Sequence, residues 1–254
     1  MCHQLPLRSA PLRSANWEFI HGDIMVGGIR AGLRDALGLC PRHAWGYAIV
    51  EVELWVYGTG PRGGHQPFDV CVLYGDLLEH VAARLRRRRS SVASLPCTLE
   101  RRGPCWICRQ LGGQDGEPVR RSFAGADATA LAQEANEMRY TTAWCVQTRE
   151  VWEGRVCPSC RSGKAPIDRG QIKEPGSGAV TCLRHLVSMP SPAGSLAELV
   201  DYLESTAARL DALGQTMRQG AQPPSLDEDG SWIETLGWFA GWDVPLALIA
   251  RSGQ

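Results

Sequence analysis

The sequence predicts a mainly helical fold with two small cysteine-rich modules and one short β-hairpin. Several segments repeat apolar residues every three or four positions, evidence for strands is confined to one short segment, and cysteine and histidine occur in closely spaced pairs. Of the 254 residues, 44% are hydrophobic and 21% are charged, a composition that can bury a core. We expect an N-terminal helical region over residues 1–90, a cysteine-rich region over 91–190 and a C-terminal helical region over 191–254.

The longest apolar run, from Ala44 to Tyr57, is a candidate core element. It contains Glu51 and Glu53 and is too short to span a bilayer. The first residues of the chain lack the apolar core of a secretory signal. We therefore expect a cytoplasmic protein with no membrane partner. In that compartment thiols stay reduced, and paired cysteines indicate metal or redox chemistry.

Two amphipathic helices are predicted between this run and residue 152. The first begins near Asp69 and continues into the arginines, because five apolar residues recur on one face: Val70, Tyr74, Leu77, Val81 and Leu85. The second has Asp127 as its N-cap and a stripe made by Leu131, Ala135, Met138, Thr142, Cys145 and Trp152.

Two further helices are predicted toward the C-terminus. Ser195 and Glu198 have the spacing of a capping box, in which each side chain hydrogen-bonds the backbone amide of the other residue. The helix that follows carries an apolar seam made by Leu196, Leu199, Leu203, Leu210, Leu213 and Met217. The last helix is expected from Ser231 to Ala250, with Pro245 kinking or ending it.

Two connectors and the hairpin separate these helices. Arg86–Pro104 is basic and then loop-like, and Gln219–Gly230 is a polar linker before the last helix. The hairpin is predicted from Gln171–Lys173 and Ala179–Thr181, which flank the turn-forming segment Pro175–Gly178.

Four pairs of candidate metal ligands share a spacing of three residues. Two have the form C-x2-C and two the form C-x2-H: Cys105/Cys108, Cys157/Cys160, Cys40/His43 and Cys182/His185. Zinc in structural sites takes four tetrahedral nitrogen and sulfur ligands, so these residues make two closed Cys3His sites with none left over. The sequence therefore predicts two zinc ions.

The C-x2-H pairs have the pattern of a helix start. Gly38 suits the end of a preceding helix. Cys40 suits the N-cap, and Pro41 suits the first helical position, where a missing amide hydrogen has no cost. His43 then lies on the same face as Cys40, and a helix N-terminus favours the thiolate form that binds metal. Cys182 stands before Leu-Arg-His in the same arrangement.

Residues 157–185 resemble a treble-clef zinc finger in three parts: a cysteine knuckle, a short hairpin, and a helix whose first turn supplies the last two ligands. The resemblance covers about 30 residues and places both pairs within them at one site. By elimination, the first C-x2-C pair then joins the first C-x2-H pair. Joining Cys105/Cys108 to Cys182/His185 instead fits the counting equally well.

The segments Gly-Leu-Cys-Pro-Arg-His and Cys-Leu-Arg-His-Leu, together with the C-x2-C pairs, also resemble an uncharacterised bacterial family with duplicated C-x2-C and C-x2-H motifs. The resemblance spans about residues 25–190 and is specific only at the motifs. The chain departs from a regular duplication because no C-x2-C pair precedes Cys40, where only Cys2-His3 is present. The resemblance implies no activity.

The other cysteines are expected outside the metal sites. Cys71 and Cys145 lie on or beside apolar helical stripes and are expected as buried thiols, whereas Cys97 is in a loop with no assigned partner. Three aromatic residues of the last helix are expected to dock it on the core: Trp232, Trp238 and Trp242.

One basic run is the only strong charge feature of a chain with 27 basic and 27 acidic residues: Arg84, Arg86, Arg87, Arg88, Arg89, Arg101 and Arg102. The functional interpretation is phosphate contact with RNA or DNA. The alternative is a solvated helix end, where arginines complement the helix dipole, and the zero net charge favours this alternative.

No sequence motif indicates a catalytic centre. The chain has no nucleophile elbow, P-loop, dinucleotide-binding glycine pattern or H-E-x-x-H helix, and Gly58–Gly64 is a predicted loop. Because closed Cys3His sites leave no position for substrate, we expect a zinc-stabilised, non-catalytic binding or regulatory protein with a protein or nucleic-acid partner. The alternatives are a metalloenzyme or iron–sulfur redox protein, and a nucleic-acid binder that uses Arg84–Arg102.

Overall fold

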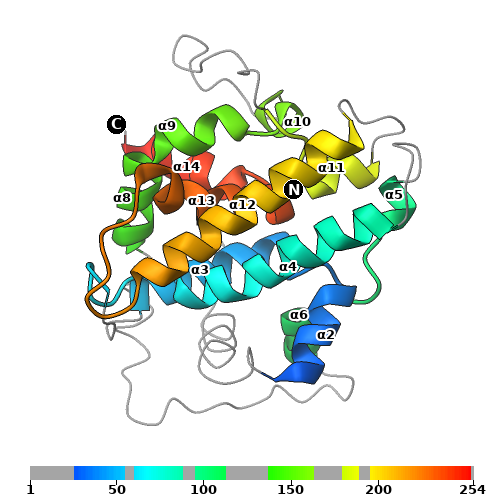
Figure 1. Cartoon of the computed structure of the whole chain (residues 1–254), viewed down its shortest axis with the longest axis horizontal. Coiled ribbons are helices and arrows are strands. Elements are labelled where there is room, and N and C mark those ends of the chain that lie inside the picture. Colours follow the sequence, from blue (N-terminus) through cyan, green and yellow to red (C-terminus); the bar gives the residue numbers. More distant parts are fainter. Residues whose placement is uncertain are drawn as a thin grey trace.

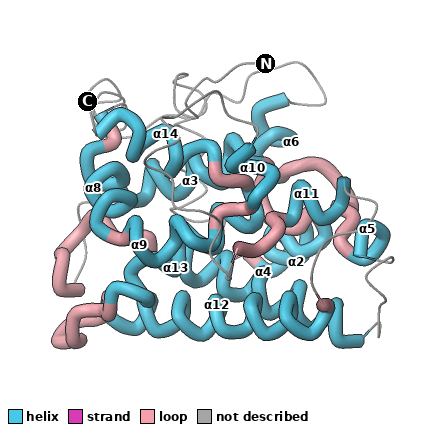
Figure 2. The backbone as a smooth tube through the Cα atoms, turned by 90° about the horizontal axis from the view of Figure 1, so that it is seen from above, coloured by secondary structure: helices cyan, strands magenta, loops and turns pink. Residues whose placement is uncertain are grey.

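Two long amphipathic helices pack along each other. In the computed structural model, α4 (Phe68–Arg87) and α12 (Leu196–Thr216) lie side by side in two perpendicular views (Figure 1, Figure 2). The structure describes residues 26–54, 60–87, 95–112, 137–162, 179–188 and 195–252. Within these ranges the helices are the regular elements, and the β contact found there is an isolated bridge between Gly60 and Gly63. The prediction of a mainly helical fold is confirmed.

Both long helices bury the faces that their sequences predict. The α4 stripe is buried at all five positions: Val70, Tyr74, Leu77, Val81 and Leu85. At the start of α12 both halves of the capping box form. The Ser195 hydroxyl accepts the Glu198 amide at 3.1 Å, and the Glu198 carboxylate accepts the Ser195 amide at 2.9 Å. Side-chain spacing and the cap therefore specify these two helices.

The C-terminal part contains two helices where one was predicted. α13 (Leu226–Ala240) begins at a second capping box, formed by Ser225 and Glu228. The last residues of the predicted linker Gln219–Gly230 therefore belong to a helix. α13 ends at Gly241, whose φ of 87° lies in the left-handed region that favours glycine. The next helix, α14, spans Asp243–Ser252.

The prediction that Pro245 kinks or ends the last helix is wrong. Pro245 is the third residue of α14, where the amide hydrogen that proline lacks would have no partner within the helix. The break lies at Gly241 instead. The docking of this region is confirmed, because Trp232, Trp238 and Trp242 are at most 1% exposed.

The predicted stripe from Leu131 to Trp152 is not a single helix. Its first part, including Asp127 and Ala135, lies outside the described residues. Met138 takes a left-handed φ of 48°, and the chain then forms three short pieces: α8 (Arg139–Gln147), α9 (Arg149–Trp152) and the 3-10 turn η3 (Glu153–Arg155). Cys145 and Trp152 are buried as predicted, whereas Thr142 is only half-buried.

The predicted core element forms α3 (Pro41–Leu54), which is buried on almost all sides. Every residue from His43 to Leu54 is buried, and α4, α8 and α13 all pack against the helix. Glu51 accepts two backbone amides in the first turn of α4, at 2.5 and 3.0 Å. Glu53 accepts the Thr141 amide in the first turn of α8 at 2.7 Å. These buried carboxylates satisfy helix amides that have no partner within their own helix.

Five short helices complete the described part of the fold: α2 (Gly27–Asp35), α5 (Leu95–Thr98), α6 (Trp106–Gly112), α10 (Pro158–Ser162) and α11 (Leu183–Ser188). Gly38 closes the turn after α2 as predicted, with a φ of 85° and an amide hydrogen bond to the Leu33 carbonyl at 2.7 Å.

The predicted hairpin has no support in the described residues. Ala179–Thr181 are described but do not form a strand, while Gln171–Lys173 and Pro175–Gly178 lie outside the described ranges. None of the described helices combines the length and the apolar character that a bilayer-spanning helix needs.

Candidate metal centres

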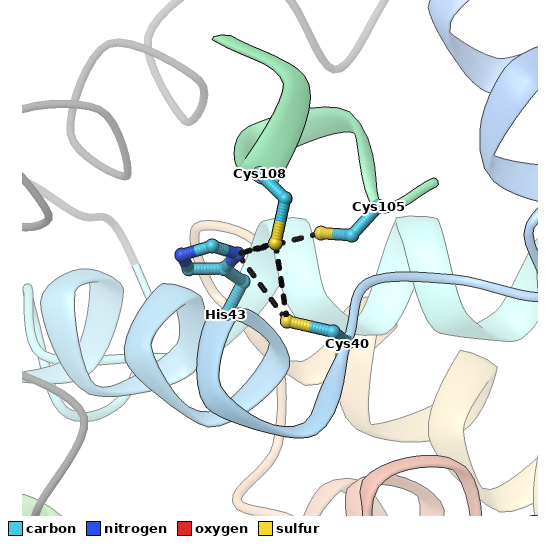
Figure 3. A group of neighbouring side chains, drawn as sticks. All are labelled: Cys40, His43, Cys105 and Cys108. Atoms are coloured by element: carbon cyan, nitrogen blue, oxygen red, sulfur yellow. Dashed lines mark hydrogen bonds between the residues drawn. The ribbon is translucent and has the colours of Figure 1, made fainter. Parts of the chain in front are cut away.

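Four side chains from two helix starts meet in the first candidate metal centre, here called centre 1 (Figure 3). Cys40 and His43 come from the start of α3, and Cys105 and Cys108 come from the start of α6. The Nδ1 atom of His43 lies 3.3, 3.4 and 3.3 Å from the sulfurs of Cys40, Cys105 and Cys108. The sulfurs of Cys40 and Cys108 are 3.7 Å apart.

The second candidate metal centre, centre 2, has the same composition. Cys157 and Cys160 come from the start of α10, and Cys182 and His185 come from the start of α11. The Nδ1 atom of His185 lies 3.4, 3.5 and 3.2 Å from the sulfurs of Cys157, Cys160 and Cys182. The sulfurs of Cys160 and Cys182 are 3.7 Å apart.

The structure therefore brings all eight predicted ligands together in two groups of four. Within each group the ligand atoms all lie within 4.8 Å of one another. Cys105 and Cys108 lie with Cys40 and His43, so the alternative grouping with the second C-x2-H pair is not the one that the structure adopts. Cys2 and His3 lie outside the described residues.

All four ligand pairs occupy the same two positions at a helix start. The first ligand of each pair is the residue before the helix, and its carbonyl accepts the amide four residues later: Cys40, Cys105, Cys157 and Cys182. The second ligand is the third residue of the helix: His43, Cys108, Cys160 and His185. The N-cap and the third helical position face each other across the first turn, so the backbone orients both ligands toward one point.

The distances within each centre match the edges of a tetrahedron around one zinc ion. Zinc–sulfur bonds of about 2.3 Å and zinc–nitrogen bonds of about 2.0 Å place tetrahedral ligands about 3.8 Å apart for two sulfurs and about 3.5 Å apart for sulfur and nitrogen. The observed distances are 3.7 Å between sulfurs and 3.2–3.5 Å between sulfur and nitrogen. A disulfide needs about 2.05 Å between sulfurs, and the described cysteines are all free thiols. The donor set fits a single metal ion.

The protonation of the thiols shows how strongly the sulfurs of each centre interact. A hydrogen bond from the Cys40 thiol lowers the pKa of Cys105 to about 3, and the same bond raises the pKa of Cys40. In centre 2, hydrogen bonds from Cys160 and Cys182 lower the pKa of Cys157. A neighbouring thiolate therefore opposes the deprotonation of a second thiol, and the charge of a bound divalent cation would offset this repulsion and allow the coordinating thiols to deprotonate.

The two centres differ in solvent access. In centre 1, Cys108 is exposed and Cys40 is half-buried. In centre 2 all three cysteines are buried. Water and small reagents therefore reach the sulfurs of centre 1 more easily than those of centre 2.

Centre 2 is joined to the C-terminal core. The backbone amide of Trp242 donates to the sulfur of Cys160, and the Arg184 guanidinium lies 3.8 Å from the same sulfur. Trp45 on α3 donates its indole N–H to the carbonyl of Gly241 at 2.9 Å. α3 begins at centre 1, so one helix and the Gly241-Trp242 step connect the two centres.

The described part of the basic run is largely engaged within the fold. Arg84, Arg86 and Arg87 lie in the last turn of α4, whereas Arg88 and Arg89 lie outside the described residues. Arg86 pairs with Glu204 at 2.5 Å. Arg101 donates to the Leu39 carbonyl at 3.2 Å, and the exposed Arg102 uses its backbone amide to bond the Asp35 carbonyl. These contacts add no support to phosphate binding.

Two of the three remaining described cysteines are buried as predicted, whereas the third lies on a short helix and not in the predicted loop. Cys71 and Cys145 are buried in the core, 4% and 0% exposed, and burial raises the pKa of both thiols. Cys97 is exposed on α5 and belongs to neither centre.

The arginine inside each C-x2-H pair was not among the predicted site residues. Arg184 approaches the Cys160 sulfur, and the positive charge of Arg42 acts on the Cys108 thiol. The signal was present in the sequence, since both pairs have the form Cys-x-Arg-His. A positive charge beside the thiols favours the thiolate form that binds metal.

Comparisons with protein-family models, curated proteins and solved structures found no match to this chain. The resemblance to a bacterial family with duplicated motifs therefore has no support from these comparisons.

Proposed function

We propose that this protein is a zinc-stabilised, non-catalytic binding or regulatory module that holds one zinc ion in each centre. The observation that supports this proposal is that four donors close a tetrahedron of zinc dimensions at each centre. The ion of each centre would neutralise charge among its thiolates and fix the helix starts that carry them. This chain's residues supply all four ligands, so no position remains for water or substrate.

The same distances weigh against the redox alternative. In an iron–sulfur cluster the four protein ligands are divided among two or more iron atoms, so they do not all converge on one point. Here the ligand atoms of each centre lie within 4.8 Å of one another, and a histidine replaces the fourth cysteine. The geometry favours a mononuclear ion with a closed coordination shell.

Zinc would supply order where the hydrophobic core cannot. α6, α10 and α11 have between five and seven residues each, which is too short for stable helices without tertiary support. Each of them begins at a ligand pair. Metal binding at such pairs contributes directly to folding, because the site does not exist in the unfolded chain.

Two finer features belong to the same proposal. The two ligand pairs of centre 2 would belong to a treble-clef-like module, with a knuckle at α10 and two ligands in the first turn of α11. The protein works in the cytoplasm, where a reducing environment keeps the six ligand thiols available for metal.

Elemental analysis of the purified full chain tests the proposal. We expect two zinc ions per chain, and Cys182→Ser should lower the content by about one ion because each ion belongs to one centre. Cys97→Ser changes an exposed thiol outside both centres and should leave two ions. Unchanged zinc in Cys182→Ser, or iron in place of zinc, would contradict the proposal.

A further inference from the structure

A cavity of about 590 Å³ extends between the two metal centres. Pro41, which follows the centre 1 ligand Cys40, lines one part of it, and Leu183, which follows the centre 2 ligand Cys182, lines another. α5 and the residues after it supply a further wall, including Leu99. The volume is in the range of about 300–1,000 Å³ that small-molecule sites occupy.

The lining combines buried apolar side chains with exposed charged ones. Leu99, Leu183 and Phe239 are at most 2% exposed and make an apolar interior. The exposed or half-buried residues include Glu100, Arg101 and Arg184, together with Val187 and the thiol of Cys97. An apolar interior with a few charged groups is the usual construction of a site for an amphipathic molecule.

The charges of the lining favour an anion. The lining includes two arginines and one glutamate, so its side chains carry one excess positive charge. The contact between Arg101 and the Leu39 carbonyl uses one of five guanidinium donors. Arg184 makes two longer contacts, each of 3.8 Å, to the Cys160 sulfur and the Asp243 carboxylate. A carboxylate can approach such groups in bidentate geometry.

We propose that this cavity, which we call the inter-centre pocket, binds one small organic carboxylate with an aliphatic body. The aliphatic part contacts the apolar interior, and the carboxylate lies between Arg101 and Arg184. The proposal rests on the proposed function, because Pro41 and Leu183 are held by helix starts that the two centres organise. The molecule that the binding module recognises is then a small organic carboxylate.

The test compares decanoate with decylamine, two probes of equal length and opposite charge, on the zinc-loaded full chain. Calorimetry should show one decanoate per chain, and decylamine should bind at least about ten-fold more weakly because it faces the excess positive charge. Decanoate should also slow the alkylation of Cys97, measured on its peptide by mass spectrometry, because Cys97 lines the pocket. Equal binding of the two probes, or unprotected Cys97, would overturn the proposal.

Matched variants locate the binding. Val187→Trp fills the pocket from a position that is 37% exposed, and we expect at least about ten-fold weaker decanoate binding. Val146→Trp makes the same change on α8 at a position that is 45% exposed and outside the pocket, and it should bind like the wild type. Equal affinities in the two variants would place the ligand elsewhere.

A third variant gives an effect that misfolding cannot imitate. Glu100→Gln removes the one carboxylate of the lining, so decanoate should bind about two- to five-fold more tightly. Weaker or unchanged binding contradicts the proposal. Zinc is measured in the same samples: two ions without decanoate binding refutes the pocket alone, whereas the absence of zinc refutes the proposed function.

Discussion

A cysteine at the N-cap position can both start a helix and bind a metal ion, whereas serine or aspartate at this position usually only starts the helix. Ser195/Glu198 and Ser225/Glu228 use the N-cap and the third helical position to satisfy backbone amides. The ligand pairs use the same two positions to aim sulfur and nitrogen at one point. Cys182→Ser keeps a good N-cap and removes a metal ligand, so it separates the loss of metal from the loss of the helix start.

The difference in exposure between the centres predicts two rates of zinc loss. A chelating dye should remove about one zinc quickly from centre 1, where Cys108 is exposed, and the second slowly from centre 2, whose cysteines are buried. Absorbance of the dye complex over time measures both phases. In Cys108→Ser the fast phase should be missing. A single rate in the wild type, or a fast phase that survives in this variant, would be evidence against the assignment.

The buried carboxylate of Glu53 predicts a pH effect on stability. Burial raises the pKa of Glu53, and hydrogen bonds from Thr141 offset part of the rise. The folded chain therefore holds this proton to higher pH than the unfolded chain, whose glutamate pKa is about 4.3. The resulting stabilisation is present below that pH and is lost as pH rises through the pKa of the folded chain.

Glu53→Gln tests this effect while keeping the oxygen that accepts from Thr141. We expect the stability of the wild type relative to the variant to fall as pH rises above about 4.3, the glutamate pKa of the unfolded chain, measured by urea unfolding with zinc present. Glu79→Gln, which changes an exposed glutamate on α4, should show a constant difference from the wild type. A constant difference for Glu53→Gln as well would show that its pKa is not raised.

At the scale of elements, the turn between α13 and α14 depends on a close contact. A Cβ atom at Gly237 would lie 2.6 Å from the ring of Trp242, a fully buried side chain that also stacks on Trp152 at a centroid distance of 6.0 Å. The Trp242 backbone amide in turn contacts the Cys160 sulfur, so the residue is held from both its ring and its backbone. The glycine is therefore required for packing.

Gly237→Ala should lower the free energy of unfolding by about 1–3 kcal/mol because it overpacks the core. Gly75→Ala is the matched control, since a Cβ at this position in α4 meets nothing within 4 Å. It should raise the free energy of unfolding by about 0.4–1 kcal/mol, because alanine restricts the unfolded chain and favours the helix. Urea unfolding measures both, and a neutral Gly237→Ala would disprove the packing argument.

Elements with a strong local signal could be predicted from the sequence, and those decided by backbone turns could not. The stripe of α4 and the capping box of α12 each contain enough local information to specify a helix. The capping box at Ser225 has the same spacing but lies inside a polar, proline-containing segment that resembles a linker. The break at Met138 depends on a left-handed residue that is not glycine, which apolar periodicity does not reveal.

At the scale of the whole molecule, one buried cluster joins both centres. Trp45 on α3 bonds to Gly241, and the adjacent Trp242 amide bonds to the Cys160 sulfur. We expect Cys40→Ser, which breaks centre 1, to lower the thermal midpoint by about 5 °C or more. Tryptophan fluorescence and far-ultraviolet circular dichroism should shift together, because the core unfolds cooperatively. Two separate transitions in this variant would refute the link.

The ligands of the candidate site could be predicted because their spacing is a local property of helix starts. Counting alone left their grouping open, because the spacing within a pair does not indicate which helix starts meet, and His43 and Cys105 are 62 positions apart in the chain. The inter-centre pocket could not be predicted from the sequence either, because its walls come from four separate helices: α3, α5, α11 and α13. Only the packed fold brings these segments together.

The placement of α3 has a practical consequence for dissecting the chain. One fragment that stops at residue 94 would keep α3 but lose Cys105 and Cys108, and its complement would keep those cysteines without Cys40 and His43. The complement would also lose Glu53, the acceptor for the first turn of α8. Neither half retains the four ligands of centre 1, and each exposes apolar surface that the other buries, so expression of separate halves should yield aggregation rather than two usable pieces.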